Sequence, residues 1–487
     1  MFKKLKDATV DIKNAIDTRL GVSKITNATL FRRVAKTSWY QGDGAAMLML
    51  FGTQVFTGLF MALAYSNNPD NAYESVQAIT NSLVLGWFVR ALHYWSGGMM
   101  VVMVVIHLFR HLLLGGYKAP REATWLVGAL MFFLVLTMSF TGYTLRWDER
   151  AVYAIRVILN MFYNVPWIGE ELVLLVQGGQ EIGGATLSRF FALHVLFIPV
   201  LLGLLIGYHL YLVVTLGVTS KIERKVDVKS ADEQQELYHK AADSKKDGEW
   251  FYPDTAFNVN LMGFIIFMIA FGLALFVGAP ELYPKANLTE ASMPMEEWWF
   301  YWYSSIIALL PPSLAPVFVV GFPLFVFFFL MSLPFLDRRP RRGIEKRPGW
   351  AVLVTFLSIA LLSLTALRMQ SPWTGLPSQK LIPLPEGVEL SQQARAGRKL
   401  FVSYGCNSCH AIAGYGPGVG PDLAKVEERL SREEVLRFIL NPPKDIPMPS
   451  YEGRLTEEEV IRIMEFVHLA QTFPFKQEQT GAKESEE

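Results

Sequence analysis

The chain has 487 residues, of which 52% are hydrophobic, and its mean hydropathy of +0.27 is typical of a membrane protein. A formal net charge of +1 provides no basic excess that would attract nucleic acid. The two cysteines, Cys406 and Cys409, lie in one short motif, so the sequence excludes a structural disulfide framework.

The N-terminal segment places Leu5, Ile12 and Ile16 at near-helical spacing among lysines, which predicts an amphipathic helix at a membrane surface. A soluble capping helix fits the same pattern. Seven later apolar runs are long enough to cross a bilayer: about 44–65, 84–114, 125–145, 190–216, 257–279, 315–336 and 350–368.

Lysine and arginine gather before the first run and after the second, fourth and sixth, whereas the loop 66–80 has neither. Because positively charged loops stay in the cytoplasm, the N-terminus is predicted inside and the chain leaves its seventh span outside. The long outer loops 146–189 and 280–314 are rich in apolar residues and are expected to form short helices. The inner loop 218–254 is expected to be solvated.

Four histidines have a spacing that suits heme. His93 and His107 are fourteen residues apart in the second run, and His194 and His209 are fifteen apart in the fourth. Fourteen helical residues cover about 21 Å, nearly four turns, so both histidines of a pair project from one helix face. Two such helices would hold two bis-histidine hemes, one near each side of the bilayer. The other membrane-side histidines, His111 and His239, are expected not to bind iron.

Glycines in two further runs repeat this pitch. Gly44 and Gly58 are fourteen residues apart in the first run, as are Gly128 and Gly142 in the third. A helix beside the edge of a flat heme needs a missing side chain. Chance placement of these residues is the alternative, but polar residues inside a membrane are costly and tend to be functional.

The chain beyond the seventh run is predicted to hold a proline-spaced linker and a small soluble domain. Cys406-Asn407-Ser408-Cys409-His410 is the attachment motif of a c-type heme: two thiols bond the porphyrin and the adjacent histidine binds iron. Met448, 38 residues after His410, is predicted as the second iron ligand. A zinc site would need two more ligands nearby, and the remaining candidate, His468, is expected to be structural.

Residues 1–345 resemble cytochrome b of the quinol-oxidising bc-type complexes, in the split b-six-f form where a four-helix cytochrome precedes a three-helix subunit. The stretches 90–96, 115–122 and 252–254 carry the resemblance, together with the spacing of His194 and His209. Residues 388–472 resemble a class I monoheme cytochrome c.

The resemblance implies an all-α integral membrane fold, with a four-helix diheme bundle, three further transmembrane helices and a small all-α cytochrome c domain. The expected domains are 1–217 (diheme, four-helix), 218–369 (three-helix), 370–387 (linker), 388–475 (cytochrome c) and 476–487 (disordered tail).

The resemblance also implies how the ligands pair. His93 and His194 would bind the outer, low-potential heme b, and His107 and His209 the inner, high-potential one. Three arginines near the heme edges would pair with propionates, although solvated helix ends explain them equally well; they are Arg90, Arg110 and Arg189. An extra covalent inner heme is expected to be absent, because Gln41 stands where that family branch has a cysteine.

The family oxidises quinol with a Pro-Glu-Trp-Tyr motif, which here reads Glu296-Glu297-Trp298-Trp299. Glu297 would accept a quinol proton, Glu296 is the second candidate, and two interfacial acids beside anchoring tryptophans are the alternative. Trp298 and Asp148 would help to line the pocket. Proline has become Glu296 and tyrosine has become Trp299, which changes the detail of that pocket.

The implied function is the cytochrome b/c subunit of a quinol:cytochrome c reductase of the cell inner membrane. One electron would go through a separate Rieske iron–sulfur protein to the c heme on the periplasmic side. The other would cross two b hemes to an inner quinone site, building a proton gradient. A homodimer is implied, and a soluble cytochrome or terminal oxidase would take the c-heme electron. The alternatives are a diheme anchor of a dehydrogenase without bifurcation, and a transporter, for which no mid-membrane polar set is evident.

Overall fold

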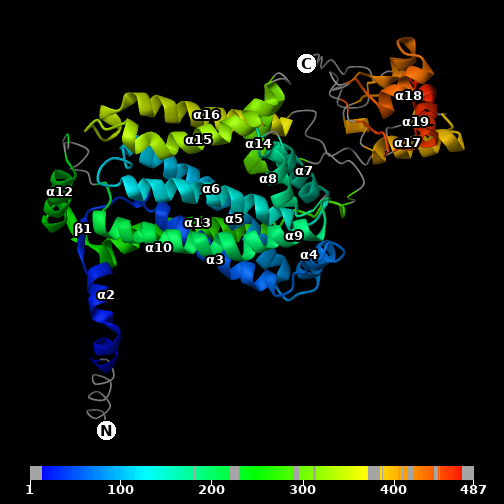
Figure 1. Cartoon of the computed structure of the whole chain (residues 1–487). Helices are drawn as coiled ribbons and strands as arrows, with labels where there is room; N and C mark the ends of the chain where they lie inside the picture. The colour runs from blue at the N-terminus through cyan, green and yellow to red at the C-terminus, as the bar shows by residue number, and fades with distance from the viewer. Residues whose placement is uncertain are drawn as a thin grey trace, which may run out of the picture. The chain divides into compact units, whose positions relative to one another are not determined.

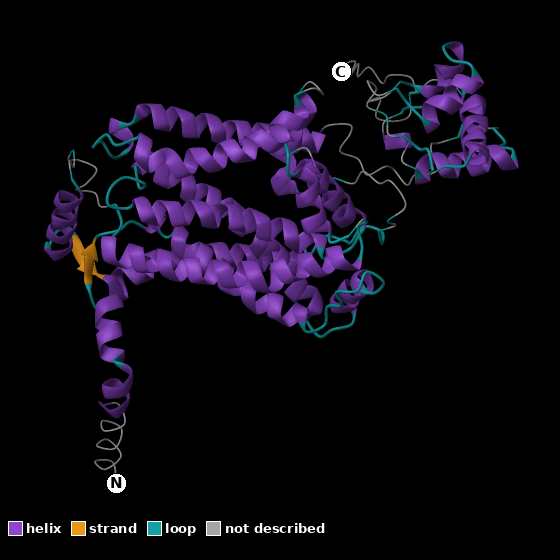
Figure 2. Cartoon of the chain, in the orientation of Figure 1, coloured by secondary structure: helices purple, strands orange, loops and turns teal. Residues whose placement is uncertain are grey.

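The computed structural model describes residues 14–473 except for 164, 180, 220–226, 228–229, 287, 289–294, 311–313, 371–383, 386–387, 405, 409, 415–420, 444–447, 449 and 454. The described chain is almost entirely helical (Figures 1 and 2). Parts of the predicted N-terminal helix and linker, and the whole of the predicted tail, lie outside the described residues. The chain divides into two compact units, Met1–Arg146 with Met161–Leu282 and Leu310–Leu362, and Trp147–Asn160 with Tyr283–Leu309 and Ser363–Glu487.

All seven predicted membrane spans are confirmed as long apolar helices. They are α3 (Asp43–Ala62), α5 (Gly86–Leu114), α6 (Glu122–Thr144), α9–η2–α10 (Gly184–Ala192, Leu193–Phe197, Ile198–Leu216), η3–α13 (Phe251–Thr255, Ala256–Phe276), α15 (Ala315–Leu336) and α16 (Pro348–Gln370). Many of their large side chains face outward, including Phe56 and Leu204 at 74% and 69% exposure. Such surfaces suit lipid, in which apolar side chains need no cover.

Within the first unit, α3, α5 and α13 pack together, while α6 contacts α5, α10 and α15 (Figure 1). Small residues let these helices approach closely, as expected in a membrane. At the crossing of α3 and α13, a Cβ added to Gly263 would lie 3.4 Å from the backbone of Ala46. Ala91 of α5 and Ala270 of α13 are fully buried. This packing fixes α5 beside α3, and α10 beside α6.

One end of the first unit gathers the basic loops. Lys118 Nζ, after α5, lies 2.8 Å from Asp337, after α15, and Arg347 contacts the same carboxylate at 3.1 Å. Near this end, strands β1 (Arg33–Ala35) and β2 (Gly248–Trp250) pair antiparallel, with Val34 opposite Glu249 (Figure 2). The inner segment predicted as a solvated loop therefore contributes β2, and also α12 (Ala231–Asp243), which packs Tyr238 and Ala241 against Ala35.

The two long loops predicted on the outer side form short helices, as expected: α7 (Glu149–Tyr163) and α8 (Gly169–Gln177) in one and α14 (Tyr301–Leu309) in the other. Helix α4 (Ala72–Asn81), in the loop after the first span, is an addition to the predicted elements. In the second unit, the start of α7 is joined to the chain before α14. Glu149 N donates to Pro284 O at 3.0 Å, and Asp148 Oδ2 accepts from Tyr283 N at 3.3 Å. Ser305 Oγ of α14 donates to Leu364 O of α16 at 2.8 Å.

The C-terminal domain is built on α17 (Gln392–Ser403), α18 (Arg432–Leu440) and α19 (Glu457–Ala470), drawn from orange to red in Figure 1. Helix α19 begins with a capping box of Thr456 and Glu459, and its apolar stripe is buried. It crosses α17 so closely that a Cβ at Gly397 would lie 1.7 Å from Arg462 O. Phe401 and Phe466 meet across this crossing, with ring centroids 5.9 Å apart.

Candidate functional site

Each of the four predicted glycines faces one of the four predicted histidines. A Cβ built at Gly58 would lie 3.3 Å from Cε1 of His93, and one at Gly142 only 2.6 Å from Cε1 of His194. A Cβ built at Gly44 would lie 3.9 Å from Cε1 of His107, and one built at Gly128 would lie 3.4 Å from Cε1 of His209. Helices α3 and α6 thus leave room beside the imidazoles of α5 and of η2–α10: a Cβ at Gly58 or Gly142 would crowd the ring, whereas one at Gly44 or Gly128 would be in ordinary contact with it.

His93 and His194 are close to each other, and the ring of each lies beside a threonine hydroxyl. The ring centroids of His93 and His194 are 6.3 Å apart. Nδ1 of His93 lies 2.8 Å from Thr57 Oγ1, and Nδ1 of His194 lies 3.1 Å from Thr141 Oγ1. A hydrogen bond at Nδ1 fixes the ring orientation and leaves Nε2 for a metal. Glycine gaps and oriented imidazoles together fit a bis-histidine heme.

At the other end of α5, His107 lies in a charged cluster. Its Nδ1 is 3.3 Å from Oδ1 of Asp43, a residue that is 1% exposed. Arg110 Nε and Nη2 donate to the same carboxylate at 2.6 and 2.8 Å. His111 contacts Arg110 through Nε2 at 3.0 Å, and its ring centroid lies 4.5 Å from that of His107. Asp43 therefore joins a predicted ligand to a predicted propionate partner.

The other two predicted propionate partners contact backbone carbonyls. Arg90 Nη2 donates to Pro280 O at 3.0 Å, and Arg189, which is exposed, donates to Leu174 O at 2.9 Å. These contacts fit the helix-end alternative as well as the predicted role.

Glu297 is buried, with 1% exposure, immediately before η4 (Trp298–Phe300). Arg150 of α7 donates to its Oε1 at 3.0 Å and also contacts the hydroxyl of Tyr283. The guanidinium lies 4.2 Å from the ring centroid of Tyr283, a cation–π distance. The second unit therefore brings a carboxylate, a cation and a phenol together around the predicted proton acceptor.

Glu296 has different partners from its neighbour. Arg368 of α16 donates two hydrogen bonds of 2.8 Å to the carboxylate of Glu296, and Ser304 Oγ donates to it as well. Burial raises the pKa of Glu296, but the hydrogen bonds from Arg368 and Ser304 outweigh it, so this pKa lies below the usual value. Trp298 packs on Trp299, with ring centroids 5.4 Å apart.

Asp148, the remaining predicted pocket residue, is fully buried and bonds backbone amides. Its Oδ1 accepts from Ala151 N at 2.9 Å, which caps α7, while Oδ2 holds Tyr283 N. These contacts place Arg150 beside Glu297, because they tie the first turn of α7 to the segment that carries Tyr283.

In the C-terminal domain, Cys406 and Met448 both pack, half-buried, against the core formed by α17 and α19. His410 Nδ1 lies 2.9 Å from Pro421 O, which orients the ring, and His410 N donates to Cys406 O at 2.9 Å. Cys409 lies outside the described residues. His468 forms an ion pair with Glu427 at 2.7 Å, in keeping with a structural role.

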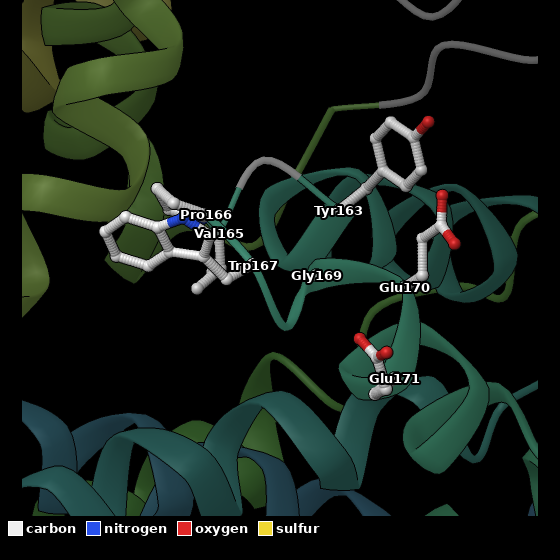
Figure 3. A pocket seen from close by; sticks show the side chains of 7 residues that line it. All are labelled: Tyr163, Val165, Pro166, Trp167, Gly169, Glu170 and Glu171. Carbon is white, nitrogen blue, oxygen red and sulfur yellow. The ribbon is translucent and has the colours of Figure 1, made fainter.

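A hollow of about 370 Å³ opens at the turn between α7 and α8. Its lining includes Tyr163, Glu170, Glu171 and Trp167, and Figure 3 shows Trp167 on the opposite side from Glu170. Trp167 is 97% exposed. The residues that line this hollow include none of the predicted site residues.

An all-α, multi-pass membrane protein with this arrangement of histidines, and with a covalent-heme motif, belongs to the electron-transport heme proteins. Comparison with known proteins narrows the class. A family model described as cytochrome b/b6/petB matches residues 30–217, and one described as cytochrome b(C-terminal)/b6/petD matches 286–378. A model described as cytochrome C oxidase, cbb3-type, subunit III matches 392–467.

Individual cytochrome b and b6 proteins are also similar to this chain. Cytochrome b of Allochromatium vinosum is 30% identical over 351 residues, which cover 69% of this chain and 83% of that protein. Cytochrome b6 of Synechococcus elongatus is 37% identical over 179 residues, 37% of this chain and 83% of that protein. The chain belongs to the cytochrome b family and carries a cytochrome c domain at its C-terminal end.

A solved structure entitled "Hyperthermophilic respiratory Complex III" has the same fold as much of the chain. Its TM-score is 0.62 at 24% identity, over 74% of this chain and 91% of that one. The predicted fusion and the all-α membrane fold are thus confirmed.

Sequence reasoning missed several side chains that contact the predicted residues. Three of them had a local signal, because Asp43, Thr57 and Thr141 each stand immediately before a predicted glycine. Arg150 and Arg368 had none, since their partners are far away in the sequence.

Proposed function

We propose that this chain is the cytochrome b/c subunit of a proton-translocating quinol:cytochrome c oxidoreductase. The observation that carries the proposal is the fourfold match of glycine to histidine, which supports two heme b sites at the two ends of α5. His93 and His194 would ligate the outer heme and His107 and His209 the inner one. When bound, these hemes and the c heme supply one-electron transfer in two directions from the quinol.

The protein's own part in quinol oxidation would fall to the cluster around Glu297. This carboxylate would accept a proton from the quinol hydroxyl and pass it outward. Arg150 holds the carboxylate at 3.0 Å, and Asp148 fixes the helix that carries Arg150. The ion pair of Glu296 with Arg368 would hold η4 in place, with Trp298 closing the pocket against water.

The cytochrome c domain would bind its heme through Cys406 and Cys409, with His410 and Met448 as iron ligands. Both cysteines of the sequence lie in the motif Cys406-Asn407-Ser408-Cys409-His410 and would bond the c heme. The iron–sulfur center of a Rieske-type reductase would therefore belong to a separate partner. We further propose a homodimeric complex that donates electrons to a cytochrome or a terminal oxidase.

We propose the inner membrane, with the N-terminus in the cytoplasm and the c domain in the periplasm. The contacts between basic loops support this orientation. The loop after α5 binds the segment after α15, through Lys118 and Asp337 at 2.8 Å, so the arginine-rich segments share one end of the bundle.

The experiment that tests the function is rapid mixing of quinol with the oxidised, purified complex, followed at the b-heme and c-heme absorption bands. Bifurcation predicts that b and c hemes are reduced together. Reduction of b heme with no coupled reduction of c heme would support the rival, a diheme anchor of a dehydrogenase. His93→Ala should abolish the b-heme phase, while His239→Ala, an exposed position, should leave it intact.

A pyridine hemochrome analysis gives an independent count. Two extractable hemes per covalent heme agree with the proposal. An additional covalent heme, or fewer than two extractable ones, would remove the ligand assignment and the transmembrane electron path with it.

A further inference from the structure

Before three of the four glycines that face the histidines, the preceding residue has a polar side-chain atom near Nδ1 of that histidine. Before Gly58 and Gly142 this residue is a threonine, and its hydroxyl meets Nδ1 of the outer histidines at 2.8 and 3.1 Å. Before Gly128 it is Val127, which has no polar atom in its side chain. Before Gly44 it is Asp43, whose Oδ1 lies 3.3 Å from Nδ1 of His107. One of the four positions therefore bears a carboxylate.

The Asp43 carboxylate is buried, and hydrogen bonds hold its orientation. Arg110 binds both of its oxygens, at 2.6 and 2.8 Å, and Gly44 N donates to Oδ1 at 2.9 Å. The Nδ1 atom of His107 is itself buried and makes no hydrogen bond to the described residues, and Oδ1 of Asp43 lies 3.3 Å from it. Asp43 is thus the polar group available to that nitrogen, and Arg110 prevents it from turning away.

We propose that Asp43 is a positioning residue of the inner heme b: its carboxylate accepts the Nδ1 proton of His107, fixes the imidazole plane and lowers the midpoint potential of the iron. This inference rests on the proposed function, in which His107 is an iron ligand. A carboxylate at Nδ1 makes an imidazole a stronger electron donor, which favours ferric iron. The hydroxyls of Thr57 and Thr141 increase the donor strength of their histidines less than a carboxylate does, because a hydroxyl is neutral.

The arrangement separates two electrostatic effects. Arg110 cancels the charge of Asp43 at long range, so the pair has little net field at the heme. The contact of Asp43 with His107 acts at short range, so Arg110 does not cancel its effect on the imidazole. The consequence is a smaller potential step between the outer and inner hemes than a neutral partner at residue 43 would give.

The test is Asp43→Asn in the full chain, with a redox titration of each b heme followed by optical spectroscopy. The reduction equilibrium of the inner heme should shift by about tenfold toward the ferrous form, or about 59 mV for one electron. The outer heme and the c heme should not shift. Thr57→Val is the matched control, because it removes the corresponding partner of His93 and should affect the outer heme alone.

A double variant separates the local contact from net charge. Asp43→Asn with Arg110→Gln removes one negative and one positive charge, so a purely long-range effect predicts no shift, whereas the proposal predicts that the upward shift persists. An unchanged inner potential in both variants, with both b hemes bound, overturns the proposal.

If Asp43→Asn alone fails to retain its heme, the double variant decides, because it removes both members of the buried ion pair; an unchanged inner potential in it would overturn the proposal. Failure of the underlying function is distinguishable, because it would show as two b hemes retained in His107→Ala.

Discussion

Arg150 donates a hydrogen bond of 3.0 Å to Glu297, although the two residues are 147 positions apart in the chain. Their side chains are 12% and 1% exposed. A buried carboxylate without a cation would be costly, so the start of α7 and the segment before η4 are bound to each other through the residue proposed to move a proton. Structure and proposed chemistry thus depend on the same ion pair.

Glu297→Gln should slow quinol oxidation by about a hundredfold, the lower range for loss of a positioned general base. Heme content and potentials should not change, because the amide keeps the shape of the side chain. Steady-state quinol:cytochrome c reduction measures the effect, with the exposed Glu281→Gln as control. Full activity would move the proton acceptor elsewhere, with Glu296 the first candidate.

Arg150→Gln should lower quinol turnover by about tenfold or more while the b and c hemes stay bound. Loss of the cation removes the ion-pair partner of a carboxylate that is 1% exposed, and breaking such a buried pair costs about 3–5 kcal/mol. The control is Arg156→Gln on the same helix, whose guanidinium bonds the carbonyl of Leu288 instead. Equal loss in both variants would indicate damage to α7 rather than to the ion pair.

Glu296→Gln should destabilise the protein by roughly 2 kcal/mol at neutral pH, since it breaks the partly buried ion pair with Arg368. The folded pKa of Glu296 is lowered, so its stabilisation is present above the ordinary carboxyl pKa and is lost as pH falls through the lowered value. The difference in melting temperature between wild type and variant should therefore shrink in acid. Glu389→Gln, at an exposed position, should show no such trend.

Gly142→Ala should reduce the content of outer heme b, because the new Cβ would lie 2.6 Å from Cε1 of His194 and would displace the ring. Gly207→Ala is the matched control on α10, where an added Cβ meets nothing within 4 Å. Extractable heme per covalent heme is the quantity to measure. Retention of both b hemes in Gly142→Ala would mean that α6 does not line the heme edge.

Met448→Ala should lower the midpoint potential of the c heme, because a thioether ligand stabilises ferrous iron. The heme should remain attached through its thioether bonds. Met464→Leu preserves the volume of a buried methionine in the same core and should leave the potential unchanged. An unaltered potential in Met448→Ala would require another iron ligand.

Local patterns were sufficient to predict the seven spans, the four histidines with their matching glycines and the covalent-heme motif. These features follow from local rules: hydrophobic length, helical pitch and the chemistry of a short motif. The same rules predicted an inner solvated loop where β2 and α12 lie, because pairing with β1 depends on residues more than two hundred positions away.

The partners of the charged residues, in contrast, depend on the packing of distant segments. Asp43 meets Arg110 across 67 positions, and Glu296 meets Arg368 across 72. No periodicity in the sequence connects such residues. Their pairing follows from which helices pack together, and from the high cost of a buried charge that has no partner.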